Sequence, residues 1–300
     1  MTDSKSTKTA IALGNFDGLH KGHADVISNA VKQSFNGLVP YVLIFDQHPQ
    51  QVLTGKMPRQ LMTYKQLKEI TEKMGCGIVH ISFDEIRNMT PDEFVKNILV
   101  DKLGAAFVSC GFNYRFGKNG AGDTNALKEL CNQHGIELSI SDAVEYSGAP
   151  ISSTRIRKEI ENGNIEEANN MLGRCFSYAA EVVSGDRRGR TLGFPTMNQF
   201  FPDNFIVPKY GVYASKSFID EKWYPSVTNI GIRPTIGNSR PRSETSVIGF
   251  SGDLYGKSIP VALISYLREE IRFSTLDELS AQIKKDSAKA SEIFEREENK

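Results

Sequence analysis

Residues Thr9–His23 read TAIALGNFDGLHKGH, and the class of fold follows from this one stretch. The apolar run Thr9–Leu13 has the length and composition of a short buried strand, and a glycine-containing turn comes after it. A helical pattern then runs from about His23 to Lys32. A helix that begins after such a turn presents free backbone N–H groups and the positive end of its dipole. The stretch therefore predicts an α/β fold with an anion site beside its first strand.

Apolar runs and helical patterns continue to alternate up to about residue 172. Further strands are expected at Val39–Phe45, Gly77–Ser82, Phe107–Cys110 and Glu137–Ile140, and further helices at Tyr64–Met74, Pro91–Leu103, Thr124–His134 and Thr154–Leu172. This alternation is typical of a Rossmann-like parallel sheet that helices cover on both faces. Ligands bind such sheets at the carboxyl ends of the strands, where the loops gather.

The pattern changes after about residue 175, where short β-rich runs replace the alternation. These runs are Tyr178–Val183, Gly211–Phe218, Trp223–Ile230, Ser246–Phe250 and Ser258–Leu267. Turn residues separate them, which is typical of a small antiparallel β-barrel. A C-terminal helix is expected at Leu276–Phe294, with Ser274 or Thr275 as its N-cap. We therefore expect two domains, residues 1–174 and residues 175–300.

The composition excludes several classes of protein. Hydrophobic residues make up 39% of the 300 residues, which is too apolar for a disordered chain. Lys and Arg together number 36, as do Asp and Glu, so the zero net charge argues against a general nucleic-acid binder. No apolar run is long enough for a signal-peptide core or a membrane span. The four cysteines are scattered, without metal-site or disulfide spacing. We expect a cytoplasmic protein whose partners are small molecules, with no nucleic acid and no membrane among them.

The turn after the first strand contains two of the five histidines of the chain, His20 and His23. Because they are three residues apart, they share one face of the first helical turn. Their imidazoles can hydrogen-bond phosphate oxygens and stabilise charge that develops there. The glycines of the turn let the backbone approach a phosphate closely. The alternative is an ordinary strand-to-helix turn with two incidental histidines.

Two further segments fit a phosphate site in the α/β half. The segment Ile151–Arg157 places hydroxyl groups and arginines at the start of a helix, which suits the β- and γ-phosphates of a nucleotide. The segment Cys110–Lys118 follows a strand, so Asn113 and its aromatic neighbours are expected at the ligand crevice. A common helix cap and simple hydrophobic packing are the alternatives for these segments.

A second concentration of polar residues lies at Gly185–Asn198, whose glycines and basic residues suggest a loop that cradles phosphates. Thr196 and Asn198 are two residues apart, so they point the same way in an extended segment. Their oxygens suit Mg²⁺ held together with nucleotide phosphates. Glu244, expected at the start of a strand, can take a proton from a hydroxyl group as a general base. The alternatives are a basic surface hairpin and a solvent-facing glutamate.

Together these motifs resemble the prokaryotic bifunctional riboflavin kinase/FMN adenylyltransferase family, also called FAD synthetases, from about Ala10 to Phe294. The histidine turn is similar to the HxGH motif of nucleotidyltransferases. The resemblance implies a Rossmann-like nucleotidyltransferase domain, followed by a riboflavin kinase domain with six antiparallel strands and a terminal helix. It implies two reactions: riboflavin and ATP give FMN, and FMN and ATP give FAD and pyrophosphate. Mg²⁺ is expected to accompany the ATP.

The resemblance also assigns roles to individual residues. It implies catalytic roles for His20, His23 and Glu244, metal ligation by Thr196 and Asn198, flavin binding by Arg268, and nucleotide binding by Gly14, Phe16, Asp17, Asn113, Ser153, Thr154, Arg157, Gly189, Arg190 and Gly193.

Three positions depart from the pattern of the family. Gln47 stands where relatives usually have proline, Ala180 where they often have glycine, and Ser246 where they often have histidine. None of the three removes a catalytic group, and the last two lie in the expected kinase domain. Two alternatives stay open: a relative that keeps only one of the two activities, and a flavin-binding regulatory protein that acts through a partner. The sequence does not define the oligomeric state.

Overall fold

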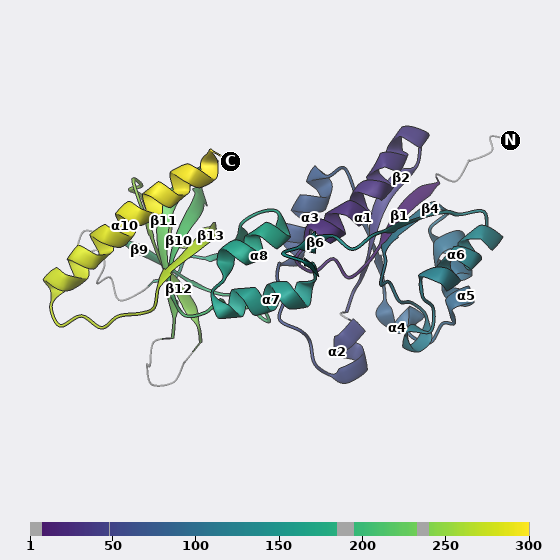
Figure 1. Ribbon diagram of the computed structural model, residues 1–300, viewed down its shortest axis with the longest axis horizontal. Coiled ribbons are helices and arrows are strands. Elements are labelled where there is room, and N and C mark those ends of the chain that lie inside the picture. Colours follow the sequence, from purple (N-terminus) through teal and green to yellow (C-terminus); the bar gives the residue numbers. More distant parts are fainter. Residues whose placement is uncertain (1–7, 48, 185–194, 233–239, 300) are drawn as a thin grey trace. The chain divides into compact units, whose positions relative to one another are not determined.

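The computed structural model describes residues 8–47, 49–184, 195–232 and 240–299 (Figure 1). The chain folds into two compact units. The first unit comprises residues 1–58 and 64–152, and the second comprises residues 59–63 and 153–300. Within the described ranges, every helix is too short or too polar to cross a membrane.

The first unit is built on a five-stranded parallel sheet. Its strands are β1 (Thr9–Leu13), β2 (Val39–Phe45), β3 (Gly77–Ile81), β4 (Ala105–Gly111) and β5 (Glu137–Ser141), in the order β3-β2-β1-β4-β5. Every neighbouring pair of strands is parallel. The strand order reverses between β1 and β4, so the ligand crevice of such a sheet is expected at the carboxyl ends of these two strands.

Helices cover both faces of this sheet, as the sequence predicts. Helix α1 (Lys21–Lys32) packs on one face, where the Ser109 hydroxyl of β4 donates a hydrogen bond of 2.8 Å to the Val26 carbonyl. On the other face, alternate residues of β1 and β4 join a buried cluster with η2 (Phe94–Lys102) and α6 (Thr124–Gln133). The remaining elements of this unit are η1 (Gln33–Asn36), α2 (Pro49–Thr54), α3 (Tyr64–Lys73), α4 (Phe83–Ile86), α5 (Pro91–Glu93), η3 (Lys118–Gly120), β6 (Glu145–Tyr146) and β7 (Ala149–Pro150).

The second unit contains a six-stranded antiparallel sheet. Its strands are β8 (Phe176–Glu181), β9 (Thr196–Phe200), β10 (Gly211–Ile219), β11 (Lys222–Gly231), β12 (Arg242–Val247) and β13 (Ser258–Arg268), in the order β8-β13-β10-β11-β12-β9. A bridge between Val183, just beyond β8, and Asn198 of β9 joins the two outer strands, so the sheet curls into a barrel. Helix α10 (Leu276–Glu298, yellow in Figure 1) lies across its strands, and Thr275 caps this helix.

Two helices, α7 (Ser153–Asn162) and α8 (Ile165–Leu172), precede this sheet. The sequence predicts a single helix at Thr154–Leu172, and that prediction is wrong. Gly163 interrupts the helix with a left-handed φ of 84°, a conformation that glycine adopts without steric cost. A Cβ at this position would also lie 3.1 Å from the side chain of Lys209, so a larger residue would have to displace that side chain as well.

The strand that carries Glu244 also differs from the prediction. The sequence predicts a strand at Ser246–Phe250, whereas β12 spans Arg242–Val247 and Glu244 lies within it rather than at its start. The intervening residues Ser243 and Thr245 are fully buried in the barrel interior although they are polar. A search for apolar runs misses such a strand. It misses β9 for the same reason, because β9 contains buried amide side chains.

Hydroxyl groups fill part of the barrel interior by pairing with one another across strands. Ser215 and Thr228 are 2.7 Å apart between their hydroxyl oxygens, and Thr228 and Thr245 are 2.9 Å apart. All three residues are fully buried. Because a buried polar group without a partner is costly, these hydrogen bonds allow hydroxyl-bearing residues to occupy core positions.

Helix α8 is fastened to the barrel by the side chain of Asn169. Its Nδ2 donates a hydrogen bond of 2.9 Å to the Leu263 carbonyl of β13, and its Oδ1 accepts one of 2.7 Å from the Phe176 N–H of β8. Met171 and Leu172 on the same helix are buried. Helix α8 therefore belongs structurally to the second unit.

We expect a fragment of residues 153–300 to be more stable than a fragment of residues 174–300. The longer fragment keeps Met171 and Leu172, and burying such a side chain stabilises a protein by about 1.5–3 kcal/mol. The measurement is urea unfolding followed by the fluorescence of Trp223, the only tryptophan of the chain. Equal unfolding midpoints would show instead that a domain beginning at residue 175, as the sequence predicts, folds without α8.

Candidate functional site

The turn between β1 and α1 is held in place by Phe16. Phe16 is fully buried and adopts a positive φ of 50°, and Leu19 follows with a φ of 37°. A hydrogen bond of 3.1 Å from the Leu19 N–H to the Phe16 carbonyl closes the turn. A Cβ on Gly14 would lie 3.1 Å from the Phe16 ring, so Gly14 leaves room for that ring. The nucleotide contacts of Gly14 and Phe16 stay predictions.

His20 and His23 lie together at the N-terminus of α1. Their rings are stacked, with centroids 3.7 Å apart and planes inclined by 16°. His20 is the N-cap of the helix, and its Nδ1 accepts a hydrogen bond of 3.3 Å from the His23 backbone N–H. An accepting Nδ1 carries no proton, so in neutral His20 the hydrogen-bond donor is Nε2. The structure thus brings the two predicted histidines into one cluster.

His23 is the more confined of the two imidazoles. Its burial, and then the neighbouring His20, hold the pKa of His23 well below the usual 6.5. Its Nδ1 is buried without a hydrogen-bond partner, and the His23 and Phe16 rings pack edge to face with their centroids 5.3 Å apart. At pH 7 His23 is therefore uncharged. Neutral imidazoles at the positive end of a helix can stabilise a phosphate by donating hydrogen bonds.

Asn113 lies at the same edge of the sheet as the histidine turn. Strands β1 and β4 run parallel with Leu13 opposite Cys110, so the loops that follow them leave the sheet at one edge. Asn113 is exposed in the loop after β4, and Asp17 is half-buried in the turn after β1. Both residues are placed where the crevice of such a sheet is expected, and their contacts with a nucleotide stay predictions.

Ser153, Thr154 and Arg157 lie at the start of α7 and belong to the second unit. The Arg157 Nε donates a hydrogen bond of 2.7 Å to the Arg59 carbonyl. Because the histidines belong to the first unit, the structure does not group these three residues with them. Their action on the phosphates of the same ATP stays a prediction.

Glu244 is at the centre of a polar row that crosses three strands of the barrel. It lies opposite Asn198 of β9 on one side and opposite Asn229 of β11 on the other. Residues directly opposite in antiparallel strands point to the same face. Thr196 shares that face, because it lies opposite Ser246, two residues beyond Glu244. The register thus brings together three predicted residues, Thr196, Asn198 and Glu244.

A cleft of about 100 Å³ lies beside this row, lined by Asn229, Gly231, Ile232, Arg242, Glu244 and Glu270. The Arg242 Nη2 is 3.1 Å from Glu244 Oε1, and 19% of each side chain is exposed. The Asn229 Nδ2 donates a hydrogen bond of 3.0 Å to Glu270 Oε1. Sequence reasoning missed Asn229 and Glu270 because only the pairing of strands brings them to Glu244, and it missed Arg242 because β12 was not predicted with its correct bounds. The alternation of Asn229 and Arg242 with buried residues along β11 and β12 is the signal that would have found these two.

The oxygens on this face form a donor set that fits Mg²⁺. Thr196 offers a hydroxyl and Asn198 an amide oxygen, which are hard oxygen ligands of the kind that Mg²⁺ prefers, and the nearby Glu244 carboxylate adds negative charge to the same face. In the part of the chain that the structure describes, no cluster of three or more His, Cys, Asp or Glu residues could hold a metal alone. A cation here would share its ligands with nucleotide phosphates. The predicted phosphate-loop residues Gly189, Arg190 and Gly193 lie outside the described residues.

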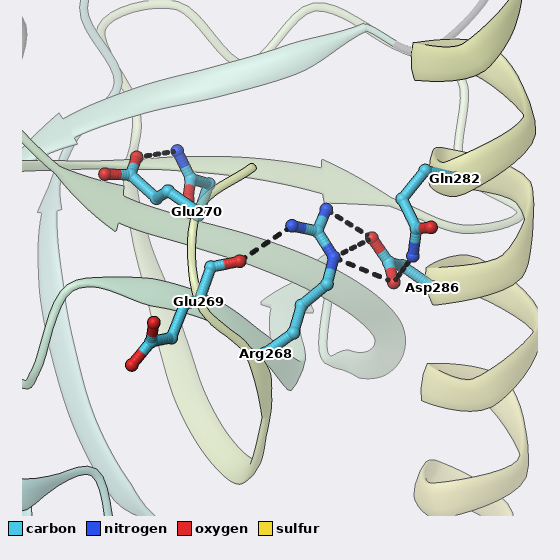
Figure 2. A network of polar contacts seen from close by, with 6 residues as sticks. Arg268, Glu269, Glu270, Gln282 and Asp286 are labelled. Atoms are coloured by element: carbon cyan, nitrogen blue, oxygen red, sulfur yellow. Dashed lines mark hydrogen bonds and ion pairs between the residues drawn. The ribbon is translucent and has the colours of Figure 1, made fainter. Parts of the chain in front are cut away.

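Arg268, the predicted flavin-binding residue, ties β13 to α10 (Figure 2). Its Nη2 and Nε donate hydrogen bonds of 2.8 Å and 3.1 Å to Asp286 Oδ2, and its Nη1 donates one of 2.9 Å to the Glu269 carbonyl. Gln282 donates a further hydrogen bond of 2.8 Å to Asp286. Arg268 therefore anchors α10, and its contact with a flavin stays a prediction.

The fold and these polar groups define a class of protein. Its members join a parallel α/β unit that has a histidine pair at a helix N-terminus to an antiparallel barrel that has its own carboxylate. Family models match the two parts separately. The model described as FAD synthetase matches residues 2–155, and the model described as riboflavin kinase matches residues 172–294.

Individual relatives resemble the chain over almost its whole length. The bifunctional riboflavin kinase/FMN adenylyltransferase of Escherichia coli K12 is 34% identical, with 95% of this chain and 92% of the relative covered. The Bacillus subtilis 168 protein of the same name is 33% identical, with 97% and 94% covered. A solved structure from Streptococcus pneumoniae, described as a macrolide-efflux protein, has a TM-score of 0.85 and 28% identity, with 95% and 94% covered. The chain belongs to the bifunctional riboflavin kinase/FMN adenylyltransferase family.

We expect acid to destabilise the first unit through His23. Its pKa is lowered in the folded state and lies near 6.5 in the unfolded chain, so below about pH 6.5 the unfolded chain binds more protons. The free energy of unfolding is therefore highest above that pH and falls as the pH is lowered, by at most about 1.4 kcal/mol per pH unit from this one group. Urea unfolding followed by circular dichroism from about pH 7.5 to about pH 5.5 measures it. His23→Gln should flatten this dependence, and an equally steep decline in that variant would contradict the assignment to His23.

Proposed function

We propose that this chain makes FAD from riboflavin in two steps. The barrel transfers the γ-phosphate of ATP to riboflavin, which gives FMN and ADP. The α/β unit transfers the adenylyl group of a second ATP to FMN, which gives FAD and pyrophosphate. One observation carries the proposal: each of the two segments matched by the family models contains its own cluster of polar groups suited to its reaction. We assign residues 1–174 to the adenylyltransferase domain and residues 175–300 to the kinase domain.

The adenylyltransferase needs charge stabilisation more than a base. The attacking group is the FMN phosphate, which is already anionic, and the reaction spreads negative charge over the α-phosphate and the departing pyrophosphate. His20, through Nε2, and His23 donate hydrogen bonds to these oxygens beside the N-terminus of α1. Core packing around Phe16 holds the turn, so the two imidazoles are already oriented before the substrates bind. Gly14, Asp17 and Asn113 contact the nucleotide, and Ser153, Thr154 and Arg157 hold its β- and γ-phosphates.

The kinase needs a base, because its nucleophile is the terminal ribityl hydroxyl of riboflavin. That hydroxyl is neutral at pH 7 and attacks poorly until its proton is removed. Glu244 takes the proton as the new O–P bond forms. Thr196 and Asn198 hold Mg²⁺ with ATP, and Gly189, Arg190 and Gly193 cradle the phosphates. When bound, Mg²⁺ neutralises charge on the phosphate oxygens. Arg268 contacts the flavin from the end of β13.

A cytoplasmic location completes the proposal. All four cysteines are free thiols in the structure, as in proteins of a reducing compartment. Burial raises the pKa of Cys76 and of Cys110 to about 12 in each case, so these thiols stay protonated and unreactive. Their role is packing in the first unit.

Chromatography of the flavins formed from riboflavin, ATP and Mg²⁺ tests the proposal with pure full-length protein. Both FMN and FAD are the expected products, in that order of appearance. FMN alone would mean that only the kinase is active. FAD formed from added FMN but not from riboflavin would mean that only the adenylyltransferase is active. Binding of flavin without any product would support a regulatory protein.

The variant His23→Ala should lose FAD formation and keep FMN formation. Removing one preorganised hydrogen-bond donor from a transition state costs about 10²–10³-fold in rate. The assay supplies FMN and ATP to measure adenylyl transfer, and riboflavin and ATP to measure phosphorylation. The kinase rate is the internal control for a correctly folded second unit. A rate of FAD formation equal to that of the parent protein would contradict the catalytic role assigned to His23.

The variant Glu244→Gln should show the opposite pattern. It keeps the size and shape of the side chain but removes the proton acceptor, and general-base catalysis typically contributes about 10²–10⁴-fold. The turnover of riboflavin phosphorylation should fall by that order, while riboflavin binding and the conversion of FMN to FAD change little. If the variant phosphorylates riboflavin at the parent rate, Glu244 is a structural residue and another group is the base.

A further inference from the structure

Arg242 is the only charged side chain among the four immediate neighbours of Glu244 on its face of the barrel. Across the strands these neighbours are Asn198 and Asn229, and along β12 they are Arg242 and Ser246. Asparagine and serine side chains carry no charge to balance a carboxylate. The register of β9, β11 and β12 therefore gives Glu244 a single cationic neighbour within this set.

The two side chains form an ion pair that is largely shielded from water. The Arg242 Nη2 lies 3.1 Å from Glu244 Oε1, and only 19% of each side chain is exposed. Residues two apart on a strand are separated by about 6.5–7 Å, so the arginine stem must extend along the strand to reach the carboxylate. A shielded carboxylate needs a partner to offset the loss of hydration. Salt and solvent screen such a pair less than one on the open surface.

The two carboxylates of the cleft have different partners. Glu270 accepts a hydrogen bond of 3.0 Å from Asn229, whereas Arg242 is paired with Glu244. The strand residue opposite Arg242 is Gly231, and a Cβ there would lie 2.7 Å from Glu270 Oε1. Because Gly231 has no side chain, the Glu270 carboxylate fits beside it and pairs with Asn229. Arg242 is left to form its ion pair with Glu244.

We propose that Arg242 is a positioning residue of the riboflavin kinase site, which holds the Glu244 carboxylate at the orientation from which it accepts the ribityl proton. The inference rests on the proposed kinase function. Arg242 does not need to touch the substrate for this role. Its loss leaves Glu244 present but free to rotate away, so turnover falls while the Michaelis constants for riboflavin and ATP change little.

The test compares Arg242→Met and Arg242→Lys with the matched control Arg240→Met. Arg240 lies two residues before Arg242, and its guanidinium pairs instead with Asp203 at 2.6 Å on the surface. Arg242→Met should lower the kcat of riboflavin phosphorylation by about 10–100-fold, the order expected when a reacting group is misplaced. Arg242→Lys keeps a cation near the carboxylate and should recover most of the loss. Arg240→Met should match the parent protein.

Two further measurements separate positioning from general damage to the fold. The conversion of FMN to FAD should be unchanged in all three variants, and the fluorescence of Trp223 in β11 should report a folded barrel. An Arg242→Met protein with parent kcat would overturn the inference and leave the proposed kinase intact. So would equal losses in the Met and Lys variants that come with a raised Michaelis constant and an earlier unfolding midpoint.

Carboxyl NMR decides the inference even if the parent protein fails to phosphorylate riboflavin, a failure that would refute the proposed kinase itself. In protein with ¹³C-labelled glutamate carboxyl groups, Glu244→Gln identifies the Glu244 resonance. That resonance should move in Arg242→Met and stay in place in Arg240→Met. A resonance unchanged by both substitutions would show that Arg242 does not hold Glu244.

Discussion

The pairing register of β11 and β12 is the constraint on which the barrel site depends. Side chains alternate between the two faces of a strand, so a slip of one residue would turn Glu244 into the barrel interior. The hydroxyl pair Thr228 and Thr245, 2.9 Å apart, fixes the register from inside. A slip would leave these buried groups without partners, at a cost in free energy. The inner face therefore selects the arrangement in which Glu244 lies opposite Asn229 on the other face.

The histidine cluster depends on a different force, the burial of an aromatic ring. Phe16 is fully buried, and its ring both fills the space over Gly14 and borders His23. Hydrophobic packing thus holds the backbone in a turn with positive φ values, which open chains seldom adopt. In the second unit polar pairing orients the side chains of the candidate site, and in the first unit apolar packing does so.

The sequence predicts local features well and register-dependent features poorly. Strands β1 and β2 have the predicted bounds, because each is an apolar run that ends at a turn. The clustering of His20 and His23 follows from a spacing within one helical turn. The bounds of β12 were missed because hydroxyl residues occupy its core positions. The break at Gly163 was missed because the apolar pattern continues past the glycine that turns the chain. Arg242 could not be associated with Glu244 because the strand that carries both was not predicted with its correct bounds, and Glu270 could not be associated with it without knowing which strands pair.

The two ends of the barrel lie next to each other. The Cys175 thiol, just before β8, donates a hydrogen bond of 3.5 Å to Glu297 near the end of α10, and Lys216 of β10 pairs with Glu298 at 2.7 Å. A module whose entry and exit coincide can be inserted into another protein, or joined end to end and reopened elsewhere, without pulling its strands apart. In this chain the barrel also holds residues 59–63, whose Gln60 forms a bridge with Phe205, so excision of the module would have to carry that short segment with it.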